Sequence, residues 1–198
     1  MTAEEVQVNY GDGLITNVQM IVEDMDVICD VIRKMPEDGL MVEWGSGGST
    51  CKWIETLSPR QKLISIEHHD EWYSRVARAI RKQWGDTSDR FTYFFRPEIG
   101  FKHGYGNVTE EHPCGTAKYI NPDDRIWDAD VFFVDGIARA ACLMAILHRR
   151  TKPNSVIMMH DYTGREDWYD WAVQFFNVQT FTHLNGYSTL AILTPKKG

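Results

Sequence analysis

The residues best suited to chemistry lie in the stretch Glu43-Trp44-Gly45-Ser46-Gly47-Gly48-Ser49-Thr50, which follows an apolar run. Glycine loses more backbone entropy on folding than any other residue, so this cluster indicates a tight turn or a backbone that a ligand approaches closely. Glu67 ends the next apolar run, 20 residues after Gly47. A carboxylate in that position can accept hydrogen bonds from both hydroxyls of a ribose. The two features together predict a nucleoside site.

A dinucleotide site is the alternative, because Gly45 and Gly47 match the first two glycines of the G-x-G-x-x-G pattern. Thr50 stands where the third glycine is required. Glu43 would repel a nearby phosphate, whereas it suits a ligand with a positively charged end. A nucleoside with a cationic, non-phosphorylated tail therefore fits better, and an NAD-dependent Rossmann oxidoreductase remains the alternative.

A second group of polar residues follows two later apolar runs, namely Asp135, His160 and Asp161. An imidazole titrates near neutral pH, so His160 is a candidate general base, although a structural role for it is equally open. The two aspartates offer the oxygen ligands that hard divalent cations prefer. Arg139 lies four residues after Asp135 and could bind an anionic substrate or form a salt bridge with either aspartate.

Strands and helices alternate along the chain in a way that would position these residues. The expected strands are 39–44, 62–67, 90–95, 130–135 and 155–160, and the expected helices are 17–34, 50–57, 70–84, 139–150 and 166–176. This alternation predicts a parallel sheet with helices on both faces. Ligands of such sheets bind beyond the carboxyl ends of the strands, where the polar residues gather.

The C-terminal part differs, because Asn185-Gly186 separates two apolar runs, 178–184 and 187–193. Asn-Gly is the strongest short hairpin signal, so an antiparallel pair is expected there. The connection 97–128 is longer than ordinary loops and is predicted to be a lid, with a packed insertion or an oligomer contact as alternatives. A short strand at 117–120 could lie within it.

The glycine stretch, followed by Ile66-Glu67-His68, resembles the cofactor site of class I S-adenosylmethionine-dependent methyltransferases. The terminal hairpin is consistent with this family, whose seventh strand runs antiparallel beside the fifth. Segments 132–139 and 158–162 are similar to a branch of small methyltransferases. The resemblance implies an α/β fold with a Rossmann-like seven-stranded sheet, mostly parallel, with a C-terminal antiparallel hairpin strand and helices on both faces. Residues 39–198 would form this domain, preceded by an N-terminal helical arm, 1–38.

The resemblance also implies roles for individual residues toward S-adenosylmethionine. The glycine turn would let the cofactor approach the backbone, Glu43 would orient its amino-acid end, Glu67 would hold the ribose, and His68 or His69 would lie beside the adenosine. Asp135 would lie near the methionine part or the transferring methyl group. The implied cofactor-binding set is Glu43, Gly45, Ser46, Gly47, Ser49, Thr50, Glu67, His68 and Asp135.

The resemblance further implies methyl transfer to oxygen or nitrogen of a small-molecule acceptor, with His160, Asp135, Asp161 and Arg139 as the catalytic set. Asp135 and Asp161 correspond to metal-binding carboxylates of catechol-type O-methyltransferases, so a divalent metal such as Mg²⁺ is possible. Tyr162 replaces the asparagine that usually follows, and the metal is therefore not favoured. A catalytically silent nucleoside-binding module of the same fold is the other alternative.

The composition limits the partners of this 198-residue chain. Its formal net charge of −7 and pI near 5.5 argue against general affinity for nucleic acid or anionic membranes. Neither a membrane span nor a secretory signal is expected. Cys29, Cys51, Cys114 and Cys142 form no C-x-x-C pair and are expected to be buried thiols. A cytoplasmic enzyme or binding protein, either a monomer or a homo-oligomer, fits these properties.

Overall fold

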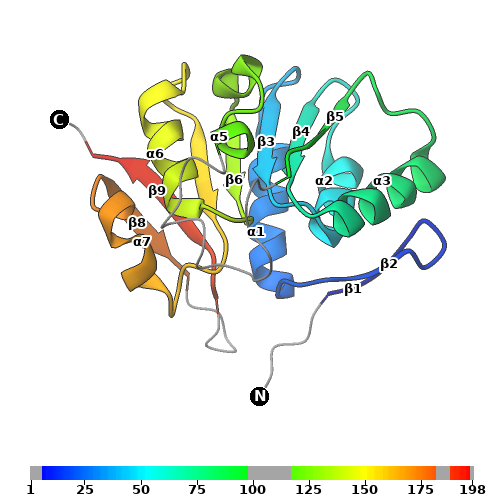
Figure 1. The fold of residues 1–198 in the computed structure, drawn as a ribbon, viewed down its shortest axis with the longest axis horizontal. Helices are drawn as coiled ribbons and strands as arrows, with labels where there is room; N and C mark the ends of the chain where they lie inside the picture. Colours follow the sequence, from blue (N-terminus) through cyan, green and yellow to red (C-terminus); the bar gives the residue numbers. More distant parts are fainter. Residues whose placement is uncertain (1–5, 98–116, 182–187, 197–198) are drawn as a thin grey trace.

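A seven-stranded sheet forms the centre of the protein, with the strand order β5-β4-β3-β6-β7-β9-β8 (Figure 1). The computed structural model describes residues 6–97, 117–181 and 188–196. Strand β9 runs antiparallel to both of its neighbours, and the other pairs are parallel. The strands are β3 (Leu40–Trp44), β4 (Lys62–Glu67), β5 (Phe91–Phe95), β6 (Val131–Val134), β7 (Val156–Met159), β8 (Phe176–Thr180) and β9 (Ala191–Pro195). The predicted fold class is confirmed.

Helices cover both faces of the sheet because successive strand residues point to opposite sides. Met41 and Phe133 belong to one apolar cluster, which α1, α2 and α3 complete. Val42 and Phe132 belong to the other, which α5, α6 and α7 complete. The helices are α1 (Val22–Arg33), α2 (Gly48–Thr56), α3 (Asp70–Trp84), α5 (Ala117–Ile120), α6 (Arg139–Arg149) and α7 (Glu166–Val173), and a 3₁₀ turn, η2, covers Asp124–Asp128.

The N-terminal arm contains a β-hairpin as well as the predicted helix. Strands β1 (Val6–Tyr10) and β2 (Ile15–Val18) pair antiparallel, and α1 begins only at Val22. Three consecutive residues with positive φ, Gly11 to Gly13, form the hairpin turn. The hairpin lies against α2 and α3 (Figure 1). The helix predicted from residue 17 is therefore too long, because residues 17 and 18 pair in the hairpin instead.

Helix α1 is also joined to the C-terminal part of the chain. Asp24 is fully buried and accepts hydrogen bonds from the Ser188 hydroxyl, at 2.6 Å, and from the Thr189 amide, at 3.2 Å. Each contact joins two residues that are far apart in the sequence, with separations of 164 and 165 positions. They provide the hydrogen bonds that a carboxylate needs when it is removed from water.

Residues 117–120 form the short helix α5, not a strand. The connection is packed against the core from α5 to η2, because Tyr119, Ile126 and Trp127 are buried. The greater part of the predicted lid, 98–116, and the Asn185-Gly186 turn lie outside the described residues. Among the helices that the structure describes, none has the length and apolar character needed to cross a membrane.

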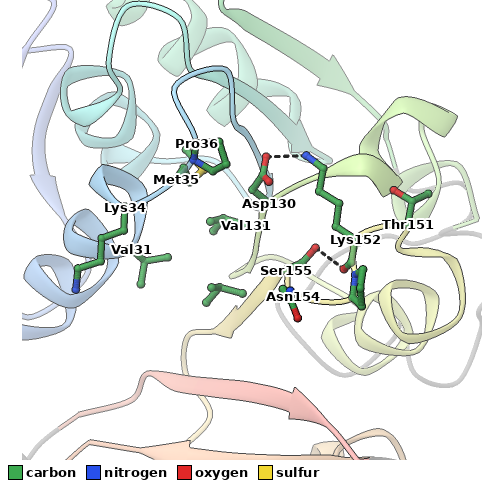
Figure 2. A pocket seen from close by; sticks show the side chains of 12 residues that line it. Val31, Lys34, Met35, Pro36, Asp130, Val131, Thr151, Lys152, Asn154 and Ser155 are labelled. Atoms are coloured by element: carbon green, nitrogen blue, oxygen red, sulfur yellow. Dashed lines mark hydrogen bonds and ion pairs between the residues drawn. The ribbon is translucent and has the colours of Figure 1, made fainter.

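A cavity of about 540 Å³ lies at the amino ends of β6 and β7, beside the C-terminal end of α1. Figure 2 shows the ion pair between Asp130 and Lys152, 2.9 Å long, at this cavity. Asp130 also accepts a hydrogen bond from the Leu40 amide at the start of β3. This cavity is at the edge of the sheet opposite the polar strand ends, so it is separate from the predicted site.

Candidate functional site

The glycine turn joins the end of β3 to α2 and requires glycine for geometric reasons. Gly45 has a φ of 91°, and a Cβ atom there would lie 2.5 Å from the backbone of Gly136. Gly136 follows Asp135 at the end of β6, so the two strand ends touch at these glycines. A Cβ atom on Gly48 would collide with the carbonyl oxygen of Asn17 in the hairpin. Both close approaches exclude larger residues at these positions.

Glu43 lies underneath this turn and is fully buried. Its carboxylate accepts hydrogen bonds from Thr50 Oγ1 at 2.8 Å, Trp53 Nε1 at 2.8 Å and Ser65 Oγ at 2.7 Å. Ser49 Oγ is 3.5 Å away. Glu43 therefore connects β3, α2 and β4, and its predicted contact with the cofactor stays a prediction.

Burial raises the pKa of Glu43 to about 8, although the donors of Ser65, Thr50 and Trp53 favour the charged form. The carboxyl group is then largely protonated at neutral pH. A protonated Glu43 would not repel a phosphate as the sequence analysis expected, because the repulsion needs a charged carboxylate.

Glu67 is buried at the end of β4 and holds the turn from the other side. Its Oε2 accepts hydrogen bonds from the amide and the hydroxyl of Ser46, and its Oε1 accepts from the amides of His68 and His69. Burial acts to raise the pKa of Glu67, but these donors and the nearby His68 imidazole outweigh it and lower the pKa. Glu67 is therefore an ionised acceptor beside the glycine turn.

The remaining predicted residues of this group surround the first turn of α2. Gly47 is the N-cap of α2, and its amide donates to Thr50 Oγ1 at 2.9 Å. Ser46 and Ser49 are buried, and Thr50 is fully buried. The hydroxyl of Thr50 therefore supports the turn from inside, where it links the Gly47 amide to Glu43.

Three aromatic side chains near the site were not assigned to it from sequence. Tyr93 Oη lies 2.5 Å from Ser46 Oγ, and Trp72 Nε1 donates to the Ser46 carbonyl oxygen. Tyr119 is buried against the His68 ring, with ring centroids 5.8 Å apart. The signal for Trp72 was its place in the first turn of the helix after Glu67. Tyr93 and Tyr119 carry no sequence signal of this kind, because only the folded sheet brings them to the site.

Asp135, His160 and Asp161 form the second predicted group, at the ends of β6 and β7. His160 Nδ1 lies 3.1 Å from Asp135 Oδ1 and 3.7 Å from Asp161 Oδ1. Asp161 has a φ of 56°, a left-handed conformation that turns its side chain back toward the cluster. Burial of His160 acts to lower its pKa, but the charges of the two aspartates and the hydrogen bond to Asp135 outweigh it and raise the pKa.

Arg139, at the start of α6, lies between the two carboxylates of this cluster. Its Nη2 is 3.4 Å from Asp135 Oδ1 and 3.3 Å from Asp161 Oδ2. The same guanidinium donates to the carbonyl oxygens of His160, at 2.6 Å, and Gly136, at 2.8 Å. Its side chain is only 11% exposed. Of the two roles expected for Arg139, the geometry favours the salt bridge over an anionic substrate.

The cluster has the donor set of a cation site, because one ligand atom from each of Asp135, His160 and Asp161 falls within 4.8 Å of the others. The carboxylate oxygens alone suit Mg²⁺, and their combination with an imidazole suits a transition metal. Arg139 already supplies a positive charge between the two carboxylates. A cation would therefore have to share these ligands with a guanidinium.

Comparison with known proteins gives structural relatives only. No family model and no curated protein sequence matches the chain. A methyltransferase-like protein from Silicibacter pomeroyi superimposes with a TM-score of 0.72 at 19% identity, covering 92% of this chain and 90% of that one. The fold of this chain is that of the class I S-adenosylmethionine-dependent methyltransferases.

Two further structures have the class I methyltransferase fold at lower similarity. The precorrin-6y C5,15-methyltransferase of Geobacter metallireducens has a TM-score of 0.58 at 16% identity, with 91% of each chain covered. An O-methyltransferase from Bacillus cereus, solved in complex with S-adenosylhomocysteine (SAH), has a TM-score of 0.57 at 12% identity, covering 88% of this chain and 79% of that one. At these identities the likeness establishes the fold.

The class I methyltransferase fold brings the two predicted groups of residues together. Glu67 and the glycine turn lie at the ends of β4 and β3, and the His160 cluster lies at the ends of β6 and β7. Strands β4, β3, β6 and β7 are consecutive neighbours in the sheet. The groups meet where Gly45 touches Gly136. A ligand along this edge would therefore contact both groups.

Proposed function

We propose that the protein is an S-adenosylmethionine-dependent methyltransferase that acts on a small-molecule acceptor at oxygen or nitrogen. The observation that carries the proposal is the position of Glu67. It is an ionised carboxylate held by hydrogen bonds beside the glycine turn, at the same edge of the sheet as the buried His160 and its partner Asp135. A ribose acceptor and a proton acceptor thus lie along one edge of the sheet.

The chain's residues fit S-adenosylmethionine in two respects. Glu67 lies beside the glycine turn, and a ribose hydroxyl would bind it in place of an exchangeable donor such as Ser46 Oγ, because four hydrogen bonds already occupy the acceptor directions of its two oxygens. Gly45 and Gly47 carry no side chains that would hold the ligand away from the backbone. When bound, the cofactor supplies an activated methyl group on a sulfonium, which needs no further electrophilic activation.

The protein must then position the acceptor and remove its proton. We assign proton removal to His160, whose Nε2 would accept the proton from the attacking hydroxyl or amine. Asp135, 3.1 Å from Nδ1, fixes the ring orientation and stabilises the imidazolium that forms. Arg139 holds Asp135 and Asp161 and the backbone of His160, so it is a positioning residue.

A divalent metal at Asp135 and Asp161 is the variant of this proposal that we favour less. Its role would be to bind the acceptor oxygen and lower the pKa of its hydroxyl. The position of Arg139 between these carboxylates supports the metal-independent form. The two forms differ in their response to a chelator.

Calorimetric titration of the protein with SAH tests the proposal directly. We expect saturable binding of one equivalent and no comparable heat with NAD⁺ or NADH in parallel titrations. A positive titration should be followed by turnover assays with a panel of small phenols, catechols and amines, with formation of SAH as the readout. Binding of NADH without binding of SAH would contradict the proposal and support an oxidoreductase. SAH binding without turnover of any acceptor would leave the silent-module alternative in place.

A further inference from the structure

The cavity at the amino ends of β6 and β7 lies between two walls from distant parts of the chain (Figure 2). One wall is the end of α1 and the residues after it, up to Pro36, and the other is the segment 151–156. Asp130 and Val131, at the start of β6, lie between the walls. The volume of about 540 Å³ is in the range of small-molecule sites, about 300–1,000 Å³.

Hydrogen bonds hold both walls in place. Gln61 Nε2 donates to the carbonyl oxygens of Met35 and Pro36, each 3.2 Å away. On the other wall, the hydroxyl of Ser155 donates to the carbonyl oxygen of Ala129 at 2.7 Å. The cavity is therefore already formed without a ligand, which lowers the entropic cost of binding.

Apolar side chains make up half of the twelve residues that line the cavity, namely Val31, Met35, Pro36, Val131, Pro153 and Val156. Val131 and Met35 are buried, whereas Val31 and Val156 are partly exposed. An apolar group bound between the walls would remove the exposed parts of these side chains from water, which is favourable.

The charges around the cavity favour an anion. Lys34 and Lys152 lie on opposite walls, and Asp130 is the one carboxylate among the described lining residues. The lining therefore carries two positive charges and one negative charge, although the whole chain has a net charge of −7. The Asp130 side chain is only 15% exposed, and its carboxylate is already paired with Lys152 and the Leu40 amide.

Several donors at the cavity remain available to a ligand. Lys152 uses one of its three N–H groups for Asp130, and its side chain is 38% exposed. Neither the Lys34 ammonium nor the Asn154 side-chain amide pairs with another of the residues drawn in Figure 2, and both residues are exposed. Donors and positive charge are thus present at the rim of an apolar cavity.

We propose that this cavity binds a small molecule that carries one carboxylate on an apolar body. The apolar body lies between the two walls, and the carboxylate lies at Lys152, with Lys34 adding positive charge from the facing wall. A small inorganic anion would leave the apolar walls in water, and a neutral apolar molecule would leave the lysine donors unused. The cavity is at the edge of the sheet opposite Glu67 and His160, so this inference does not rest on the proposed function.

Heteronuclear NMR titration with three probes tests the proposal. Phenylpropanoate has both required features, phenylpropanamide lacks the charge, and acetate lacks the apolar body. The backbone amides of Val131 and Val156 report on the cavity, and those of Gly45 and Gly47 report on the opposite edge of the sheet. We expect saturable shifts at Val131 and Val156 with phenylpropanoate, with a Kd of about 1 mM or lower. Phenylpropanamide should bind about threefold to tenfold more weakly, and acetate should not saturate these shifts.

Two kinds of variant separate the walls from the charges. Val31→Trp should fill the cavity and abolish binding, whereas Val22→Trp, at the 48% exposed start of the same helix, should not change it. Lys152→Gln should weaken phenylpropanoate binding about threefold and leave phenylpropanamide binding unchanged, and Lys152→Arg should retain the preference for the acid. Lys34→Gln, a substitution outside the Asp130 ion pair, should show the same selective loss. Melting temperatures show which variants are folded.

Four results would overturn the inference. They are the absence of saturable shifts with phenylpropanoate, equal affinities for the acid and its amide, shifts at Gly45 and Gly47 in place of Val131 and Val156, and unchanged binding in folded Val31→Trp. Saturating SAH should leave the affinity for phenylpropanoate unchanged, because the proposed cofactor site is at the other edge of the sheet. Failure of SAH to bind would therefore reject the proposed function alone, and failure of phenylpropanoate to bind would reject this inference alone.

Discussion

Ser46 donates both its amide and its hydroxyl to the same oxygen of Glu67, at 2.9 and 2.8 Å. Ser46, whose backbone a ligand would approach, is thus held in place by Glu67, which would bind the ribose. This coupling means that Glu67 organises the turn in addition to contacting the ligand. Loss of Glu67 should therefore affect SAH affinity and the stability of the turn together.

We expect Glu67→Ala to weaken SAH binding by about 1.5–3 kcal/mol, the scale of hydrogen bonds to a charged group. Calorimetry measures this change, and urea unfolding should show a loss of stability in the same variant. Glu55→Ala is a matched control, because Glu55 is a half-exposed carboxylate on α2 that pairs with Lys52. Unchanged SAH affinity in Glu67→Ala would contradict the assigned role.

Glu43→Gln should reveal the buried proton of Glu43. The pKa of Glu43 is about 8 in the folded protein, compared with 4.5 ordinarily, so the folded state retains a proton that the unfolded chain releases between these pH values. The stability from Glu43 is therefore complete below about pH 4.5 and is lost as the pH rises to about 8.

Glutamine does not titrate, so the stability of the unchanged protein relative to Glu43→Gln should decrease across this window. Urea unfolding at pH 5, 6.5 and 8 measures the difference. Glu55→Gln, at a partly exposed position, provides the comparison. If the difference in free energy of unfolding between the unchanged protein and Glu43→Gln stays constant from pH 5 to pH 8, Glu43 is ionised in the folded protein.

His160→Ala should reduce the methyl-transfer rate by about 10²–10⁴, as expected for loss of a general base. The rate of the unchanged protein should rise with pH through an inflection above pH 6.5, because Asp135 and Asp161 raise the pKa of His160. His160→Gln should lack this inflection. Chelation with EDTA should change the rate little. Activity that survives His160→Ala and disappears with EDTA would show that the metal form is correct.

Arg139→Ala should destabilise the protein by about 3–5 kcal/mol, because it removes the buried cation that bridges Asp135 and Asp161. The variant should then gain melting temperature on addition of Mg²⁺, whereas the unchanged protein should not. Arg165→Ala is the control, since Arg165 is a more exposed partner of Asp161 at 3.1 Å. Equal Mg²⁺ stabilisation of both proteins would mean that a cation binds despite Arg139.

The sheet and its helices were predictable because their apolar residues recur with clear periods. The runs ending at Trp44 and Glu67 gave the strand ends, and the site followed from the rule that ligands bind there. The hairpin of the N-terminal arm was missed because its second strand, Ile15–Val18, adjoins α1 and shares its apolar character.

Side-chain partners were less predictable than strand ends. The interior position of Glu43 depends on Trp53 and Ser65, which come from two other elements. Tyr119 reaches the site from a connection whose course no local pattern determines. Arg139 was recognised as a possible salt-bridge partner, but its place between both carboxylates needs the relative positions of β6 and β7.

The bond between Asp24 and Ser188 has a consequence for the synthesis of the protein. Asp24 leaves the ribosome early, whereas Ser188 is made 164 residues later. Helix α1 can form early, but its buried carboxylate lacks this partner until the last strand is nearly complete. Contacts over such separations slow folding. The Asp24 carboxylate therefore completes its hydrogen bonds with Ser188 and Thr189 only after residue 189 has been synthesised.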